Sequence, residues 1–145
     1  MKTTTLLRIV AVLWIIWGAV HVLAGVLTLN FSLQADMASA IGGIADAVAA
    51  EQLEAAYPAA LSGILGQHGF NLLWFGLATL LSSLWIWKGN WRAVAFAAII
   101  GGLADLGYFL FLDLGGYVHF VPGTVMTLIS GSAILLSLLA YYRTS

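Results

Sequence analysis

The sequence has no cysteine, only two prolines and very little charge, and each shortage narrows what the chain can be. The absence of cysteine excludes disulfides, iron–sulfur clusters, thiolate metal sites and cysteine nucleophiles. Charged residues make up 8% of the 145 residues, against about a quarter in a typical soluble domain. Polar side chains are therefore too few to cover a water-exposed globule. The net charge of −1 gives no indication of nucleic-acid binding.

The chain instead contains long apolar segments: 62% of its residues are hydrophobic, and its mean hydropathy is +1.02. A helix needs about 20 apolar residues to cross the hydrocarbon core of a bilayer. Four segments meet this requirement: residues 6–29, 68–87, 93–112 and 120–142. We therefore predict an all-α, integral membrane four-helix bundle that forms one transmembrane domain over residues 1–145. The first run exceeds the roughly 7–15 apolar residues of a signal peptide, which favours a retained helix.

The basic residues predict the orientation of this bundle, because all five fall at one side of it. They precede or open the first span, occupy the turn between the second and third spans, and follow the fourth: Lys2, Arg8, Lys88, Arg92 and Arg143. The loop over residues 30–67 contains four acidic residues and no basic one. By the positive-inside rule, both termini are cytoplasmic. The simplicity of the chain favours the inner (plasma) membrane of a prokaryote.

The loop over residues 30–67 also contains an apolar pattern near helical spacing. Its members are Met37, Ile41, Ile44, Val48 and Leu53, with acidic residues between them. This pattern predicts one amphipathic helix that ends at Pro58. Such a helix either covers the outer mouth of the bundle, as a lid or a partner surface, or simply joins two spans. The sequence favours neither alternative.

Polar residues inside the predicted spans gather in their outer half. At 1.5 Å per residue, His21 lies roughly 10 Å beneath the outer surface, and Asp105 reaches a similar depth in the third span. The other polar residues expected there are His68 and Asn71 at the start of the second span, Tyr108 above Asp105, and His119 at the start of the fourth. An ionisable group within a span is by default a functional hypothesis. The alternative is a hydrogen bond between Asp105 and His21 that serves helix packing alone.

Glycines flank this polar region in the first span. Gly18 and Gly25 bracket His21 on roughly one face of the predicted helix. Small residues let membrane helices approach closely, and they also make room for a flat cofactor. Three imidazoles and one carboxylate permit heme ligation, a first-row metal site or proton transfer. The H-x-x-x-H spacing typical of zinc on one helix is absent.

Four short motifs, in chain order, resemble the membrane-bound styrene oxide isomerases. They are His21 followed by Ala24-Gly25, the pair His68 and Asn71, the basic turn from Lys88 to Arg92, and the run DLGYFLF from Asp105 to Phe111. The resemblance covers all four spans. It implies an oligomeric, heme b-dependent isomerase that acts on a small apolar epoxide. It also implies that His68 ligates the heme iron and that Asn71 and Tyr108 assist the reaction.

The chain departs from that family at three positions. His68 and Asn71 are three residues apart, closer than the family spaces them, and Phe109 competes with Tyr108 for the tyrosine position. Asp105 stands where the family has a neutral amide. A negative charge beside a Lewis-acid iron alters the chemistry, so heme binding does not by itself imply isomerase activity.

The leading hypothesis is a cavity that binds heme b, or a similar cofactor, and a small apolar ligand, in a chain that forms homo-oligomers. His68 is the preferred metal ligand, His21 or His119 the second ligand, and Asp105 orients a histidine or carries a proton. One alternative is a non-catalytic accessory subunit in which Asp105 pairs with a partner membrane subunit. Another is a small proton-coupled transporter, which the apolar inner half of the spans disfavours.

Overall fold

The computed structural model describes residues 2–143, which form helices and contain no strand. The long helices are α1 (Thr3–Leu33), α4 (Ala60–Trp87), α5 (Trp91–Tyr108) and α6 (Val125–Tyr142). The π-helical segment η1 (Phe109–Asp113) extends α5, and η2 (Phe120–Thr124) leads into α6. Two short helices, α2 (Met37–Ile44) and α3 (Ala50–Leu53), lie between α1 and α4. The predicted all-α architecture with four long apolar helices is confirmed, and each of the four is long and apolar enough to cross a membrane.

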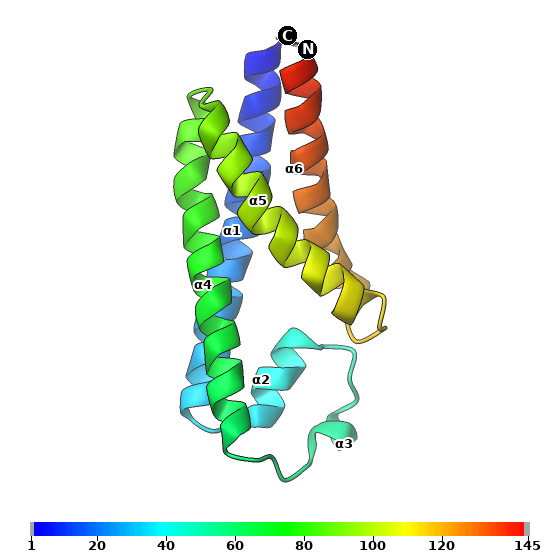
Figure 1. Ribbon diagram of the computed structural model, residues 1–145. Helices are drawn as coiled ribbons and strands as arrows, with labels where there is room; N and C mark the ends of the chain where they lie inside the picture. The colour runs from blue at the N-terminus through cyan, green and yellow to red at the C-terminus, as the bar shows by residue number, and fades with distance from the viewer. Residues whose placement is uncertain (1, 144–145) are drawn as a thin grey trace.

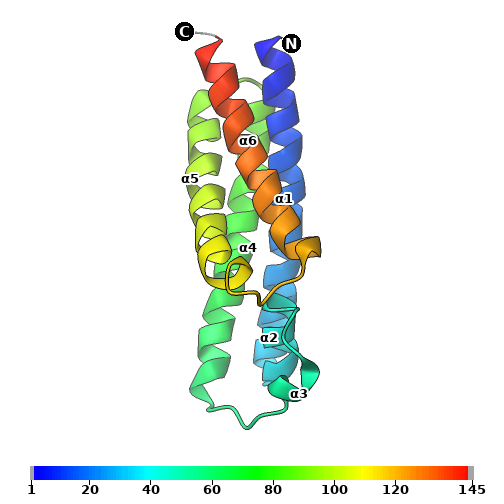
Figure 2. The ribbon, with the colours of Figure 1, turned by 90° about the vertical axis from the view of Figure 1, so that its right-hand side faces the viewer.

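The four long helices run alternately up and down (Figure 1). Each packs most extensively against two neighbours, in the order α1, α4, α5, α6 and back to α1. Both chain ends and the α4–α5 turn lie at one end of the bundle, here called the terminal end (Figures 1 and 2). The opposite end, which holds α2 and α3, is called the loop end. All five basic residues belong to segments at the terminal end, as their positions in the sequence predict.

The first two long helices extend beyond the predicted spans. With 31 and 28 residues, α1 and α4 are about 46 and 42 Å long, whereas α5 with η1 has 23 residues and spans about 34 Å. Helix α4 begins at Ala60, eight residues before the predicted start of the second span at residue 68. Residues 60–67 contain two glycines and a glutamine, so they fail an apolar-run criterion although packing against α1 keeps them helical. His68 consequently lies two turns inside α4.

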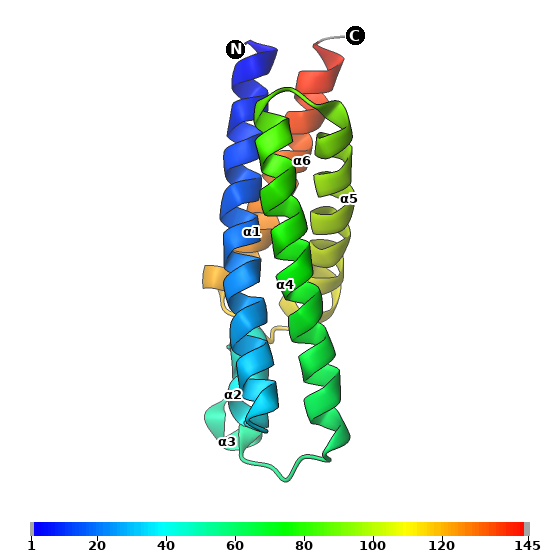
Figure 3. The same cartoon turned by 90° about the vertical axis from the view of Figure 1, so that its left-hand side faces the viewer.

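Helices α1 and α4 lie side by side over most of their length (Figure 3). Three pairs of small residues, spaced by seven on each helix, mark the contact: Gly18 with Gly76, Gly25 with Gly69, and Ser32 with Ser62. A Cβ atom added at Gly25 would lie 2.7 Å from the carbonyl oxygen of Gly69, closer than real atoms approach. A seven-residue repeat of small residues is what allows two helix backbones to touch along a seam. Gly18 and Gly25 therefore serve helix packing, not space for a cofactor.

The terminal half of the bundle is packed and apolar. Leu6, Val10, Trp14 and Ile86 are fully buried there. The buried hydroxyl of Ser83 donates to the carbonyl oxygen one turn back in its own helix (2.8 Å), as do those of Thr79 and Ser82. These hydroxyls are satisfied within α4, so they offer no chain of polar groups toward the terminal end.

The loop forms two short helices instead of the single amphipathic helix predicted over residues 37–57. Asp36 caps α2 by accepting the Ser39 N–H (3.1 Å), and hydrogen bonding by the Ser39 side chain and backbone N–H holds the pKa of Asp36 below its usual value. Helix α2 ends at Ile44 because the residues that follow form hydrogen bonds with the α5–α6 turn instead of continuing the helix. The Asp46 carboxylate accepts the backbone N–H of His119 at 2.7 Å, and the Ala47 N–H donates to a carbonyl in the same α5–α6 turn at 3.0 Å. The loop is thereby tied across the loop end of the bundle.

Candidate functional site

A cavity of about 400 Å³ lies toward the loop end, between the four long helices and α2. Its volume falls within the range of small-molecule sites, about 300–1,000 Å³. Most of its wall is apolar, with Val20 from α1, Leu72 and Phe75 from α4, and Met126 from α6. Its polar groups are few: Thr28, His21, His68, Asp105 and Tyr108. An apolar cavity with a few converging polar groups is the usual form of a binding or active site.

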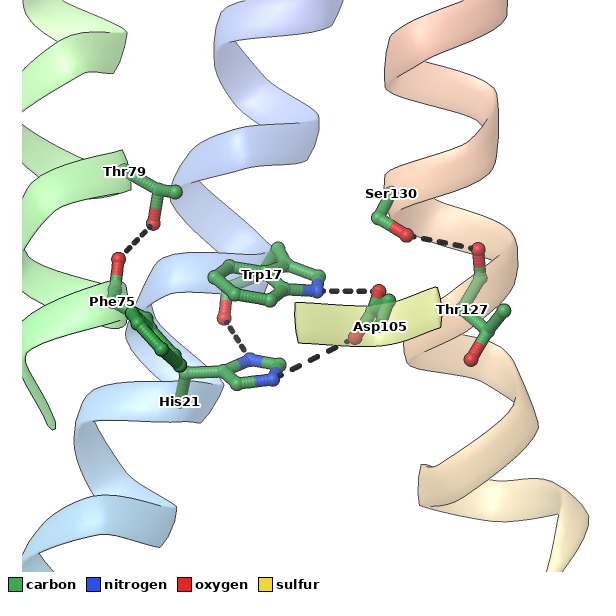
Figure 4. A network of polar contacts seen from close by, with 7 residues as sticks. All are labelled: Trp17, His21, Phe75, Thr79, Asp105, Thr127 and Ser130. Carbon is green, nitrogen blue, oxygen red and sulfur yellow. Dashed lines mark hydrogen bonds and ion pairs between the residues drawn. The ribbon is translucent and has the colours of Figure 1, made fainter. Parts of the chain in front are cut away.

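The Asp105 carboxyl is the most buried ionisable group of this cavity, with a side chain only 5% exposed. Helix α5 carries it to the centre of the bundle, where the Trp17 indole of α1 donates its N–H to Oδ2 at 2.7 Å (Figure 4). Ser130 of α6 also lies beside the carboxyl. The Trp17 indole thus links the Asp105 carboxyl of α5 to α1. Its Oδ2 atom is fixed by the indole, which leaves Oδ1 directed toward His21.

The His21 imidazole is oriented by the same tryptophan (Figure 4). Its Nδ1 atom lies 2.9 Å from the backbone carbonyl oxygen of Trp17, one turn earlier in α1. Because a carbonyl oxygen only accepts hydrogen bonds, Nδ1 carries a proton. The imidazole also stacks on the Trp17 indole, with ring centroids 3.5 Å apart and planes 18° apart. The remaining nitrogen, Nε2, lies 3.8 Å from Oδ1 of Asp105.

These contacts make His21 and Asp105 a pair of ionisable groups that interact through their charges. A distance of 3.8 Å is too long for a direct hydrogen bond and short enough for a strong charge interaction. An isolated buried carboxylate is costly, so one proton on the pair, on either the imidazole or the carboxyl, keeps the site neutral overall. Both groups line the cavity. Chemically, the pair provides a proton donor and a proton acceptor at one point of an apolar wall.

Two further predicted residues, His68 and Tyr108, also line the cavity. His68 shares its face of α4 with Leu72 and Phe75, and no hydrogen bond to its ring occurs among the described residues. The Tyr108 hydroxyl lies against Gly123 of η2, where an added Cβ atom would come within 2.6 Å of it. The structure thus brings together four of the six predicted residues.

The other two, Asn71 and His119, lie outside the cavity. Asn71 is rotated away from the lining face of α4, and its side-chain oxygen accepts the Trp74 indole N–H at 3.2 Å. His119 is exposed, and its contact with the loop is made by its backbone N–H. Asn71 lies about 60° around α4 from His68, on the side away from Leu72, and the cavity is lined on this helix by His68, Leu72 and Phe75.

Sequence reasoning missed Trp17, the residue that fixes both members of the pair. Two signals identify it: it stands four residues before His21, hence on the same face of α1, and it lies in mid-span. Interfacial tryptophans belong at the ends of spans, where they anchor the helix in the headgroup region. A tryptophan buried in the middle of a span, one turn from a histidine, indicates a hydrogen-bonded partner.

Among residues 2–143, no group of three or more histidine, cysteine, aspartate or glutamate side chains is arranged to hold a metal ion. A site built from protein ligands alone is therefore not formed by these residues. Comparison of the chain with protein-family models, with curated proteins and with solved structures finds no match. The geometry of the cavity is thus the basis for a functional proposal.

Proposed function

We propose that the chain is a multi-pass protein of a prokaryotic inner membrane, with both termini in the cytoplasm. Four long apolar helices support membrane insertion, and the collection of all basic residues at the terminal end supports this orientation. The loop end, with the cavity, then faces outward. A fluorescent protein fused after Ser145 should fluoresce, and alkaline phosphatase fused there should be inactive. The reverse pattern contradicts the orientation.

Within this membrane protein, the cavity binds a small, largely apolar molecule whose one polar atom faces His21 and Asp105. The observation that carries this proposal is that His21 and Asp105, both held by Trp17, meet at the wall of a mostly apolar cavity. The pair is suited to donate a proton to an oxygen atom of the ligand and to take a proton back. Since Asp105 is hydrogen-bonded within the chain, it needs no partner subunit to satisfy it, which favours this function over that of an accessory subunit.

The resemblance to styrene oxide isomerases supplies the class of substrate, a small apolar epoxide. Isomerisation of an epoxide to an aldehyde changes no atom count and needs a proton donor or Lewis acid at the oxygen. Styrene oxide is the probe, incubated with the protein in lipid nanodiscs while the aldehyde is measured by gas chromatography. Asp105→Asn should abolish turnover, whereas Ser132→Ala, on an exposed part of α6, should not change it. Equal turnover in Asp105→Asn and in the unmodified protein contradicts the role of the pair.

A heme b cofactor in this cavity is a second candidate, favoured by one observation. The His68 ring lines the cavity without a hydrogen bond among the described residues, and Phe75, Tyr108 and Phe111 provide aromatic surface for a porphyrin. These residues fit ligation by one histidine. When bound, the heme would supply a Lewis acid to the substrate oxygen. His21 and Asp105 would hold a proton near that oxygen, and the apolar wall would exclude water.

Absorption spectra of protein purified in detergent, oxidised and dithionite-reduced, test this second candidate. A Soret band that is lost in His68→Ala and kept in His119→Ala supports heme ligation by His68. Protein that is colourless after expression in heme-replete cells contradicts it. That outcome leaves the acid–base role of His21 and Asp105 to be judged by the turnover assay.

A further inference from the structure

Toward the loop end the cavity is bounded by helix α2. Gly43 and Ile44, at the last turn of α2, form its wall on that side. The segment that follows is tied to the α5–α6 turn by the hydrogen bond from the His119 N–H to Asp46 and by that of Ala47. Helix α2 itself contains no charged residue. A molecule arriving from water on this side therefore meets an apolar helix that is held in place at its end.

The wall of the cavity is different between α4 and α5. Helix α5 leans away from α4 toward the loop end (Figure 1), and the cavity is lined there by His68 on one side and by Gly107 and Phe111 on the other. Phe111 is 75% exposed although it lines the cavity. A Cβ atom added at Gly107 would meet no other described atom within 4 Å. Helix α5 thus leans away from α4 on this side of the cavity. Gly107, which lies there, has no side chain to fill the space between the two helices.

We infer that the cavity opens sideways into the bilayer, between α4 and α5, and that its ligand is a lipid-dissolved apolar molecule with one hydrogen-bonding atom. Gly107 keeps this opening free. The helices around it present large apolar side chains to the outside, as expected for surfaces in contact with lipid. A molecule that crosses there passes from hydrocarbon to a mostly apolar wall with few polar groups, among them His68 at the opening and the His21–Asp105 pair deeper in the cavity. The inference rests on the proposed ligand-binding role of the cavity and adds the route and the solubility class of the ligand.

The absence of native cysteine makes the route directly measurable. Ala24→Cys places one thiol in the cavity, on α1 across from the opening. Protein in liposomes is treated either with N-phenylmaleimide, which dissolves in the bilayer, or with a sulfonated maleimide, which stays in water. Gly107→Leu is added to fill the opening, and Gly131→Leu serves as the matched control. Gly131 is also a helical glycine with no described atom within 4 Å of an added Cβ, and it is not part of the cavity wall.

The apolar reagent should label Ala24→Cys, and the sulfonated reagent should not. Adding Gly107→Leu should abolish labelling by the apolar reagent, and adding Gly131→Leu should leave it unchanged. Labelling by the sulfonated reagent, or labelling that persists with Gly107→Leu, overturns the lateral route. Thermal unfolding of each variant in detergent verifies folding. Because the thiol reaction needs neither substrate nor Asp105, failure of the turnover assay and failure of this inference are distinguishable.

Discussion

The close contact between α1 and α4 predicts a large effect of one added methyl group at Gly25. In Gly25→Ala the Cβ atom would lie 2.5 Å from the Leu73 nitrogen, 2.7 Å from the Gly69 oxygen and 2.8 Å from the Leu73 Cα. All three are backbone atoms, so no rotamer change relieves the overlap, and the helices must separate. Overpacking of this kind destabilises by about 1–3 kcal/mol, even though alanine is the better helix former by about 1 kcal/mol.

Thermal unfolding in detergent measures this effect. For a chain of this size a loss of about 1–3 kcal/mol lowers Tm by about 3–12 °C. Gly131→Ala is the control, because an added Cβ there meets no described atom within 4 Å and the helix-forming gain stands alone. Its Tm should stay the same or rise. Equal effects of the two substitutions would refute the reasoning that backbone contact between α1 and α4 requires glycine at position 25.

Three further predictions concern the site and the loop. Asp105→Asn keeps an oxygen that accepts the Trp17 indole N–H, so its stability should match that of the unmodified protein. Asp105→Ala leaves this buried N–H without an acceptor and should lose about 1–3 kcal/mol of unfolding free energy. Equal Tm values of the two variants would argue against the hydrogen bond between Trp17 and Asp105. Asp46→Ala removes the acceptor for the His119 N–H, so limited proteolysis should cleave the loop over residues 45–57 faster while the Tm of the bundle is unchanged; unchanged cleavage would show that this tie does not hold the loop. The pKa of Asp36 is lowered in the folded chain by its hydrogen bonds to Ser39, so capping of α2 is complete above the unfolded pKa of about 3.8 and is lost as pH falls through the lower folded value. Proteolysis near α2 should therefore increase at acid pH. An Asp36→Asn variant should lack this increase.

The four long helices were predictable because the apolar residues that identify them in the sequence also stabilise them in lipid or in the packed bundle. An apolar run of about 20 residues has no stable place except lipid or a packed bundle, and all four runs are helical. Their ends were less predictable. Residues 60–67 are too polar to count as a span, and their helix depends on packing against α1, which hydropathy does not report. The loop helix was predicted as one piece because its pattern could not reveal the hydrogen bonds of Asp46 and Ala47 to a distant turn.

The depth of the site residues along their helices was predictable from the sequence, but the direction in which each side chain points around its helix was not. Counting 1.5 Å per residue placed His21 and Asp105 at one level, and in the structure His21 Nε2 lies 3.8 Å from Asp105 Oδ1. The same count placed Asn71 beside His68, yet Asn71 does not line the cavity. Which face of a helix points inward depends on its neighbours, and depth alone carries no information about it. The part played by Trp17 depends on a backbone carbonyl and an indole N–H, which no residue pattern displays.

Photolabelling tests the central claim, that the cavity beside His21 and Asp105 takes up a small apolar molecule from the bilayer. A small alkyl diazirine is dissolved in nanodiscs that contain the protein, activated by light, and its sites of attachment are mapped by mass spectrometry. The account predicts attachment to Asp105, reduced by an excess of styrene oxide and lost in Gly107→Leu but not in Gly131→Leu. Attachment confined to the lipid-facing side chains of the four helices, with Asp105 unlabelled, would contradict it.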